Sequence, residues 1–294
     1  MSKQATLAKR AKDCLNAPGL ITMPCCFDAF SARLIQQAEF PLTFMSGFAV
    51  SAARLGLPDT GLISYGEMLD QGRNICAAVD IPVFGDGDTG YGNPMNAKRT
   101  VEGYIQAGFA GIMVEDQVSP KRCGHTEGKE VVGRNEAMER MGAVIEARDE
   151  ARALGNDIVV IARTDARATR GLEEALARAQ AFHDLGADLL FVEAPRSTVE
   201  MQHICDTLSG PKMVNLLEQG VTPLLSHDEL ETMGFKVAAY PLTLISTAAL
   251  AMQNALSKLK QGATVNSLLS FDEIKDVVGF NEYNETLNRL TSDS

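Results

Sequence analysis

The chain has 294 residues, of which 45% are hydrophobic and 22% charged, and its formal net charge is −11. This composition is typical of a folded globular protein and excludes a disordered or collagen-like chain. The acidic balance also argues against a nucleic-acid partner, because binding a phosphate backbone needs a basic surface. The length suits one α/β barrel, which typically needs about 250 residues, so we expect residues 1–294 to form a single domain.

The six cysteines show no CxxC spacing, and no secretory signal sequence precedes them. We therefore expect free thiols in a reducing compartment and a cytoplasmic protein. Residues 237–257 carry no charge and are long enough to cross a bilayer, but they include Pro241 and several hydroxyl and amide side chains. We interpret this stretch as a buried strand followed by a buried helix, and we expect no membrane partner.

Short apolar segments, each followed by a helical pattern, recur along the chain and predict eight strands. They lie at residues 20–25, 42–46, 81–85, 111–115, 158–163, 187–193, 212–217 and 237–242. Segments of helical length with apolar residues three to four apart lie between them, for example at 94–107, 135–154, 172–185 and 226–233. Strands that are buried on both faces and alternate with helices form parallel sheets. We therefore predict a closed (β/α)8 barrel with an N-terminal helix and C-terminal helices at about 248–294; an open doubly wound sheet of six units is the alternative.

Acidic side chains gather at the predicted carboxyl ends of the strands, where a barrel places its catalytic groups. Asp86 and Asp88 close the third strand within GDGDTG, Glu115 ends the fourth, and Asp59 lies in the loop after the second. Hard oxygen ligands with no histidine or paired cysteine nearby suit Mg²⁺, or Mn²⁺, rather than zinc. The alternative is a turn rich in solvated charge. The repetition at the next strand end favours a metal.

The connection after the fourth strand, at about 117–135, is longer than most βα loops, and long barrel loops often act as lids. It contains KRCGH at residues 121–125. Neighbouring positive charge favours the thiolate form of a cysteine, so Cys123 is a candidate acid/base, with Lys121 and His125 as candidate catalytic partners. The alternative is a chance thiol in a solvated basic loop.

Arg163 ends a fully apolar segment, and burial of a guanidinium requires a counter-anion. We interpret it as a ligand for a substrate carboxylate that pairs with Asp165, Glu193 or another strand-end acid when substrate is absent. Backbone N–H groups and neutral donors suit a second carboxylate. We assign that role to Ser46, Gly47, Phe48 and Asn215.

Seven motifs in this order together resemble the isocitrate lyase/phosphoenolpyruvate mutase superfamily over nearly the whole chain. They are SGFAVSAARLGLPD (46–59), GDGDTGYGNP (85–94), VEDQVSPKRCGH (114–125), GKEVV (128–132), IARTDARA (161–168), FVEAP (191–195) and NLLEQGVTPL (215–224). The resemblance implies a TIM barrel with Mg²⁺ held near Asp86, while Asp59, Asp88 and Glu115 act largely through water. It also implies a homotetramer, a dimer of dimers, in which the last helix is exchanged between neighbours.

On this resemblance, KRCGH corresponds to the lid motif of the carbon–carbon lyases, with Cys123 as the acid/base; mutases and several decarboxylases of the superfamily lack that cysteine. Members that cleave isocitrate or methylisocitrate have Tyr where this chain has Phe44, and Arg where it has Ser246. A smaller dicarboxylate is therefore implied, and the base for the substrate hydroxyl is unassigned. We count Gly124, Glu193 and Ser246 among the substrate-binding residues.

The motifs SGFAVSA, GDGDTG and GKEVV are most similar to the branch of 2,3-dimethylmalate lyase, petal death protein and oxaloacetate hydrolase. We predict a Mg²⁺-dependent lyase that breaks a carbon–carbon bond in a small 2-hydroxy dicarboxylate through an enediolate that Cys123 protonates. The substrate is a 2-alkylmalate, such as 2,3-dimethylmalate, or hydrated oxaloacetate, which would yield oxalate and acetate. The alternatives are a methylisocitrate lyase, a P–C bond phosphonomutase or phosphonopyruvate hydrolase, and a non-catalytic barrel.

Overall fold

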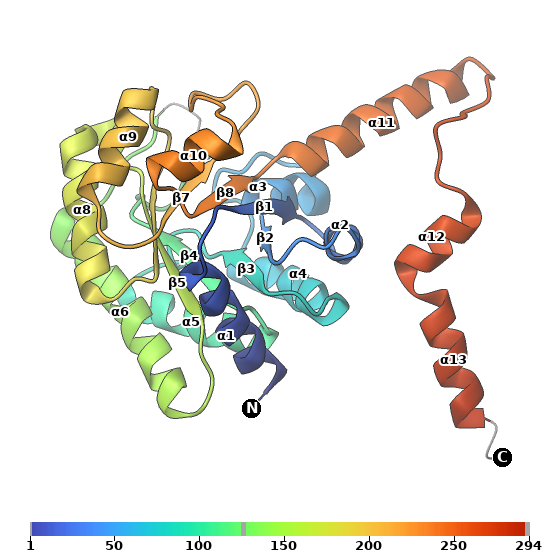
Figure 1. Ribbon diagram of the computed structural model, residues 1–294, viewed down its shortest axis with the longest axis horizontal. Helices are drawn as coiled ribbons and strands as arrows, with labels where there is room; N and C mark the ends of the chain where they lie inside the picture. The colour runs from blue at the N-terminus through green and yellow to red at the C-terminus, as the bar shows by residue number, and fades with distance from the viewer. Residues whose placement is uncertain (1, 125–127, 292–294) are drawn as a thin grey trace.

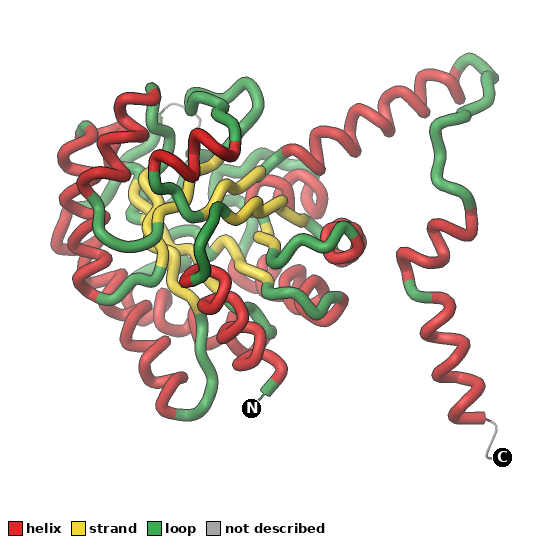
Figure 2. Tube along the Cα trace, viewed as in Figure 1, coloured by secondary structure: helices red, strands yellow, loops and turns green. Residues whose placement is uncertain are grey.

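The computed structural model describes residues 2–124 and 128–291. In that part of the chain eight parallel strands form a closed barrel, in which β1 pairs with β2 on one side and with β8 on the other (Figures 1 and 2). The strands are β1 (Ile21–Cys26), β2 (Thr43–Met45), β3 (Val83–Asp86), β4 (Gly111–Glu115), β5 (Val159–Thr164), β6 (Leu189–Val192), β7 (Lys212–Asn215) and β8 (Val237–Tyr240). The predicted closed barrel is confirmed, and the open sheet is wrong.

Helices connect the strands and surround the barrel. They are α1 (Lys3–Asn16), α2 (Ala29–Gln37), α3 (Gly47–Val50), the π-helical turn η1 (Ser51–Leu55), α4 (Tyr65–Ala78), α5 (Pro94–Ala107), α6 (Arg134–Ala153), α7 (Ala166–Arg170), α8 (Leu172–Leu185), α9 (Thr198–Thr207), α10 (His227–Met233), α11 (Thr243–Lys260), α12 (Phe271–Val278) and α13 (Phe280–Thr291). Local signals set their ends: the Asn93 side chain caps the first turn of α5, and Gly108 ends that helix in the left-handed conformation.

The first helix covers the amino end of the barrel. Leu7 and Leu15 of α1 pack in the same apolar cluster as Phe84 and Phe191 from the barrel interior. The Gln4 side chain donates a hydrogen bond of 2.8 Å to the carbonyl of Phe109, just before β4 begins. Because this end is closed by α1, ligands reach the barrel from the carboxyl ends of the strands.

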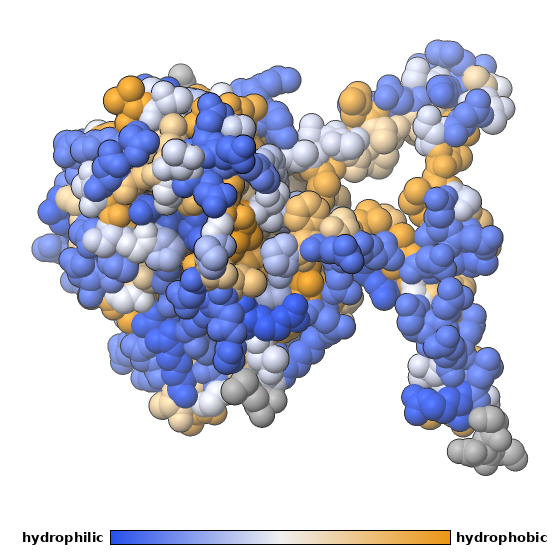
Figure 3. All heavy atoms as spheres, in the orientation of Figure 1, coloured by the Kyte–Doolittle hydropathy of each residue, from blue (hydrophilic) through white to orange (hydrophobic). Residues whose placement is uncertain are grey.

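After β8 the chain leaves the barrel as an arm of three helices, α11 to α13 (Figure 1). No residue of α11 is buried, although β8 before it is, so the prediction of a buried helix in this stretch is wrong. The helix projects from the barrel, which leaves Leu250, Met252, Leu256 and Leu259 exposed. Figure 3 shows further hydrophobic side chains along the arm, and α12 returns to contact α2 of the barrel.

The uncharged stretch 237–257 is thus divided between β8 and the first part of α11. Over residues 2–124 and 128–291, no helix combines the length and the apolar character that a membrane crossing needs.

Candidate active site

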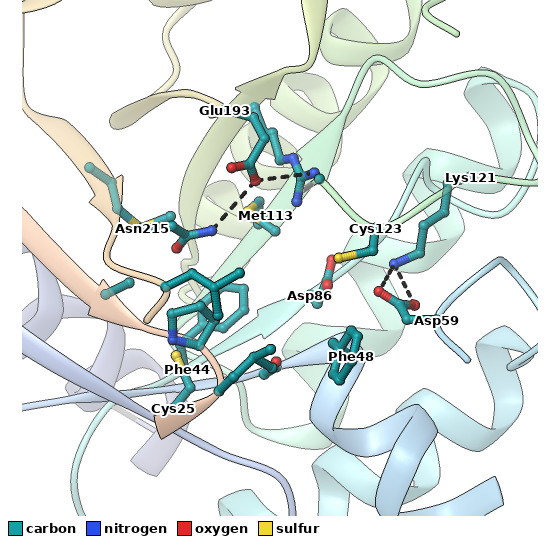
Figure 4. A pocket seen from close by; sticks show the side chains of 18 residues that line it. Cys25, Phe44, Phe48, Asp59, Asp86, Met113, Lys121, Cys123, Glu193 and Asn215 are labelled. Carbon is teal, nitrogen blue, oxygen red and sulfur yellow. Dashed lines mark hydrogen bonds and ion pairs between the residues drawn. The ribbon is translucent and has the colours of Figure 1, made fainter. Parts of the chain in front are cut away.

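A cavity of about 60 Å³ opens at the carboxyl ends of the strands (Figure 4). The structure brings ten of the predicted site residues to it: Ser46, Phe48, Asp59, Asp86, Lys121, Cys123, Gly124, Arg163, Glu193 and Asn215. Asp88 and Glu115 are buried beside it rather than lining it. Ser246 lies on α11 and lines a different cavity with Glu218 and Thr243, so this chain does not bring it to the site. The prediction for His125 lies outside the described residues.

The ammonium group of Lys121 lies inside the acidic cluster. Its Nζ is 2.7 Å from Oδ1 of Asp59 and 2.9 Å from Oδ1 of Asp88, and each of these side chains is at most 5% exposed. Burial alone would lower the pKa of Lys121, but the charges of Asp88, Asp86 and Asp59 outweigh burial and raise that pKa well above its ordinary value. The sequence predicts Lys121 as a catalytic partner of Cys123; in the structure its ammonium group pairs with two carboxylates.

Asp86 is fixed by two hydrogen bonds and by close packing against Gly47. Its Oδ1 accepts the N–H of Asp88 at 3.1 Å, and the Tyr104 hydroxyl donates to its carbonyl at 2.6 Å. A Cβ at Gly47 would lie 2.4 Å from Oδ2 of Asp86, so only a glycine lets α3 approach this closely. Burial, and then the charge of Asp88, raises the pKa of Asp86. The ionised form of Asp86 therefore costs free energy unless a cation lies beside it.

These acids have the chemistry of a Mg²⁺ site. Burial raises the pKa of Glu115 well above its ordinary value, and among the described residues Oε1 of Glu115 has no hydrogen-bond partner. In the same part of the chain no three acidic, histidine or cysteine side chains converge as a ready-made metal site. Mg²⁺ commonly takes one or two carboxylates and keeps several waters, so the oxygen donors fit an ion held directly by Asp86 and otherwise through water.

Arg163 is buried beside three acids on neighbouring elements. Its Nε lies 2.8 Å from Asp165 and 3.1 Å from Glu115, and Nη2 lies 3.2 Å from Glu193. Burial alone would lower the pKa of Arg163, but the charges of Asp165, Glu115 and Glu193 outweigh it and raise that pKa well above its ordinary value. In the parallel pairing of β4 with β5, Glu115 lies directly opposite Arg163, so both residues stand at the carboxyl ends of their strands. Arg163 is thus a permanent cation at the cavity.

The backbone of the connection after β4, which was interpreted above as a lid, passes close over Arg163. A Cβ at Gly124 would lie 2.6 Å from Nη2 of Arg163 and 2.5 Å from Oε2 of Glu193, so any other residue at this position would displace one of these two paired side chains. Cys123, directly before it, is partly exposed and lines the cavity, and Figure 4 shows its sulfur directed inward. None of the six cysteines forms a disulfide bond, as predicted.

Sequence reasoning missed the apolar wall of the cavity, which β2, β7, β8 and the segments after them provide. Its residues include Phe44, Met213, Leu217, Pro241 and Leu242. The signal was present, because side chains two apart on a strand share a face. Asn215 was predicted to face the site, and this alternation places Met213 and Leu217 beside it.

Comparisons with known proteins agree with this geometry. The family model described as phosphoenolpyruvate phosphomutase matches residues 12–260. The chain is 37% identical over 282 residues to 2,3-dimethylmalate lyase of Eubacterium barkeri, which covers 95% of this chain and 96% of that protein. The structure of oxaloacetate acetylhydrolase with the inhibitor 3,3-difluorooxalacetate gives a TM-score of 0.92 at 34% identity over 96% of each chain. Phosphonopyruvate hydrolase with oxalate and Mg²⁺ gives a TM-score of 0.84 at 27% identity, over 98% of this chain and 99% of that one.

Proposed function

The chain belongs to the isocitrate lyase/phosphoenolpyruvate mutase superfamily, and from that premise we propose that it cleaves the C2–C3 bond of a small 2-hydroxy dicarboxylate. The substrate is a 2-alkylmalate such as 2,3-dimethylmalate, or hydrated oxaloacetate. One observation carries the proposal: a buried carboxylate, a permanent guanidinium and a lid thiol line the same small cavity, as Asp86, Arg163 and Cys123. These three groups serve metal binding, anion binding and proton transfer respectively.

The substrate carboxylates bind at two places on the cavity. Arg163 binds one of them, in competition with the acids Asp165, Glu115 and Glu193 that surround it. Ser46 and Phe48 line the same cavity at the start of α3, where the first backbone N–H groups of the helix suit the other carboxylate. Asn215, whose Nδ2 donates to Glu193 at 3.4 Å, adds a neutral donor.

A divalent cation, most simply Mg²⁺, would bind at Asp86, with Asp59, Asp88 and Glu115 contributing through water. When bound, it would supply Lewis-acid stabilisation to the substrate oxygen that becomes the 2-oxo group. The buried position of Asp86 excludes bulk water from this oxygen, which strengthens every electrostatic contact there.

Cys123 supplies the proton that ends the reaction. When C2–C3 breaks, the bonding electron pair stays on the departing half, which becomes an enediolate. The thiol of Cys123 transfers its proton to that carbon and becomes a thiolate. The substrate hydroxyl loses its proton as its oxygen becomes the 2-oxo group. Because Phe44 has no hydroxyl, a group other than residue 44 accepts this proton, and return of one proton to the Cys123 thiolate completes the cycle.

The apolar wall favours a substrate with a small alkyl group. Met213, Leu217 and Pro241 bound the cavity opposite the charged groups, and none of them carries a side-chain donor or acceptor for a third carboxylate. This wall supports the assignment of a smaller substrate than methylisocitrate independently of Ser246, which lines a different cavity.

The arm supports assembly as a homotetramer, a dimer of dimers with exchanged C-terminal helices. A helix without buried residues that exposes Leu250, Met252, Leu256 and Leu259 is unfavourable in water. A second copy of this chain offers the same apolar face, and closed symmetric dimers bury such faces against each other.

The proposal is tested with a substrate panel: 2,3-dimethylmalate, 2-methylmalate, oxaloacetate, methylisocitrate and phosphonopyruvate, each assayed with Mg²⁺ and with EDTA. We expect Mg²⁺-dependent turnover of a malate or of oxaloacetate, with kcat/KM at least about 100-fold above that for phosphonopyruvate. A preference for methylisocitrate would show that Ser246 was over-interpreted. Turnover of phosphonopyruvate alone would indicate P–C chemistry, and Mg²⁺-dependent stabilisation without any turnover would indicate a non-catalytic barrel.

A further inference from the structure

Lys129, on the return segment of the lid, is buried although it lies in a loop. Its side chain is only 3% exposed, and its Nζ lies 2.9 Å from Oδ1 of Asp165. The same ammonium group donates a hydrogen bond to the backbone carbonyl of Gly124. Lysine is rarely buried unless it is paired, so this arrangement ties the lid segment to the end of β5.

The anchor of this contact is itself rigidly held. Asp165 has a fully buried side chain, accepts hydrogen bonds from Arg163 at 2.8 Å and 3.1 Å, and donates its own N–H to Asp116 at 2.9 Å. Asp116 in turn pairs with the buried Arg178 at 3.0 Å. Lys129 therefore connects Gly124 to a fixed point of the barrel rather than to another part of the loop.

Gly124 is confined from two directions. Lys129 binds its carbonyl, while its α-carbon packs against Arg163 and Glu193 so closely that no Cβ would fit. Cys123 is the residue directly before it, so confinement of Gly124 also restricts where the thiol can point.

We propose that Lys129 is a positioning residue for Cys123: by tying Gly124 to Asp165, it holds the thiol at the place where the departing carbon must be protonated. The proposal rests on the lyase function proposed above. Proton transfer requires the donor within hydrogen-bond reach, and a misplacement of about 1 Å can cost about 100-fold in rate. A flexible loop alone does not provide that accuracy.

The base of the lid does not depend on Lys129. The N–H of Val118 donates to the carbonyl of Glu130 at 2.9 Å, and the N–H of Val132 donates to the carbonyl of Asp116 at 2.9 Å. Arg178 also donates to the carbonyl of Val132 at 2.9 Å. Loss of Lys129 should therefore free Gly124, the residue directly after Cys123, while the lid stem and the two hydrogen bonds between Gln117 and the backbone of Arg122 stay in place.

The test compares Lys129→Met with Lys98→Met. Lys98 also forms ion pairs, with Glu146 and Glu150, but on the outer helices away from the cavity. We expect Lys129→Met to lower kcat about 100-fold with less than about a threefold change in KM, because Arg163 keeps its own contacts. Lys98→Met should leave both constants unchanged.

Two further measurements show whether Lys129 positions the Cys123 thiol or only supports the fold. If Lys129 acts through the thiol, adding Lys129→Met to Cys123→Ser should lower kcat by less than about threefold, whereas independent effects would multiply. Independently of turnover, alkylation of Cys123 by iodoacetamide, followed by mass spectrometry, should be at least about fivefold faster in Lys129→Met, while Cys14 on α1 reacts at the wild-type rate.

The outcomes distinguish this inference from the proposed function. A wild-type enzyme that turns over a malate, together with a Lys129→Met variant that keeps wild-type kcat and wild-type Cys123 alkylation, overturns the inference alone. Multiplicative losses in the double variant also overturn it, because Lys129 would then support the fold generally. If no substrate is turned over but Cys123 alkylation still changes in Lys129→Met, the positioning of the thiol stands and the lyase function fails.

Discussion

The two walls of the cavity are built on opposite principles. On the wall formed by β3, β4, β5 and the lid, charged groups are buried and bound to one another, as Lys121 is to Asp59 and Arg163 is to Asp165. On the wall formed by β2, β7 and β8, lining side chains such as Met213 and Leu217 carry no charged or hydrogen-bonding group. The first wall has few positions that can change alone, because the loss of one partner leaves a buried charge uncompensated. On the second wall, a substitution that changes the volume of one apolar side chain by a small amount is tolerated.

This difference separates chemistry from selectivity. Electrostatic stabilisation and proton transfer need groups that are fixed before the substrate arrives, and dense ion pairing provides that. Selection between alkyl groups needs only space, and each methylene changes binding by about 1–3 kcal/mol. Substitutions on the charged wall should therefore alter the rate for all substrates alike, whereas those on the apolar wall should alter the order of preference.

The largest effect is expected from Cys123→Ser. A serine hydroxyl at neutral pH is a far weaker acid than a thiol, and a positioned acid contributes about 100- to 10,000-fold, so kcat should fall by that range for every substrate. Steady-state kinetics on the active members of the panel measures it. Cys14→Ser, a change of the same size on α1, serves as the control and should keep full activity. Unchanged turnover by Cys123→Ser on all substrates would disprove the assigned role.

An intermediate effect is expected from Leu217→Ala on the apolar wall. The enlarged cavity should shift the ratio of kcat/KM for 2-ethylmalate over 2-methylmalate about tenfold toward the larger substrate. Competition assays with the two substrates in one mixture measure this ratio directly. The control is Leu224→Ala, at an exposed leucine outside the cavity, which should leave the ratio unchanged. An equal fall for both substrates would mean that Leu217 supports the fold instead of the pocket.

Much of the charged wall could be predicted from the sequence because it follows strand ends. Asp86, Glu115 and Arg163 each stand where an apolar segment stops, and parallel strands bring their carboxyl ends to one edge. The ion-pair partners of the residues on this wall could not be predicted in the same way. Lys121 is six residues beyond the end of β4, and nothing in local spacing shows that its ammonium group turns back to Asp59, 62 residues earlier in the chain.

The arm shows where sequence patterns mislead. An uncharged stretch such as 237–257 predicts burial, but the pattern does not say whether the covering surface comes from the same chain. Here α11 has the composition of a buried helix but an exposed position, and only the tertiary or quaternary context decides whether such a helix is covered.

Lys129 was missed for a related reason. A lysine in a long loop is usually solvated, and the burial of Lys129 depends on a carbonyl and a carboxylate from other positions in the chain.

The smallest effect is on stability, and its sign distinguishes a functional carboxylate from a structural one. Burial and the charge of Asp88 raise the pKa of Asp86 above its ordinary value of 3.8. The folded state therefore binds this proton more tightly than the unfolded state does, and the free energy of unfolding falls as pH rises from about 3.8 through the raised pKa. At neutral pH and without Mg²⁺, Asp86→Asn should remove this cost and raise the unfolding temperature, by about 2–4 °C for each kcal/mol recovered.

The matched control is Asp80→Asn, which should act in the opposite direction. A hydrogen bond from Lys3 lowers the pKa of the exposed Asp80, so its charged form is favoured by folding, and its loss should leave the unfolding temperature equal or slightly lower. Added Mg²⁺ should raise the unfolding temperature of the wild type but not of Asp86→Asn, because ligand binding stabilises only a state that binds it. If Asp86→Asn is destabilised in the absence of Mg²⁺, Asp86 is a structural member of the buried ion-pair network, like Asp59 and Asp165, rather than a carboxylate that a metal ion neutralises.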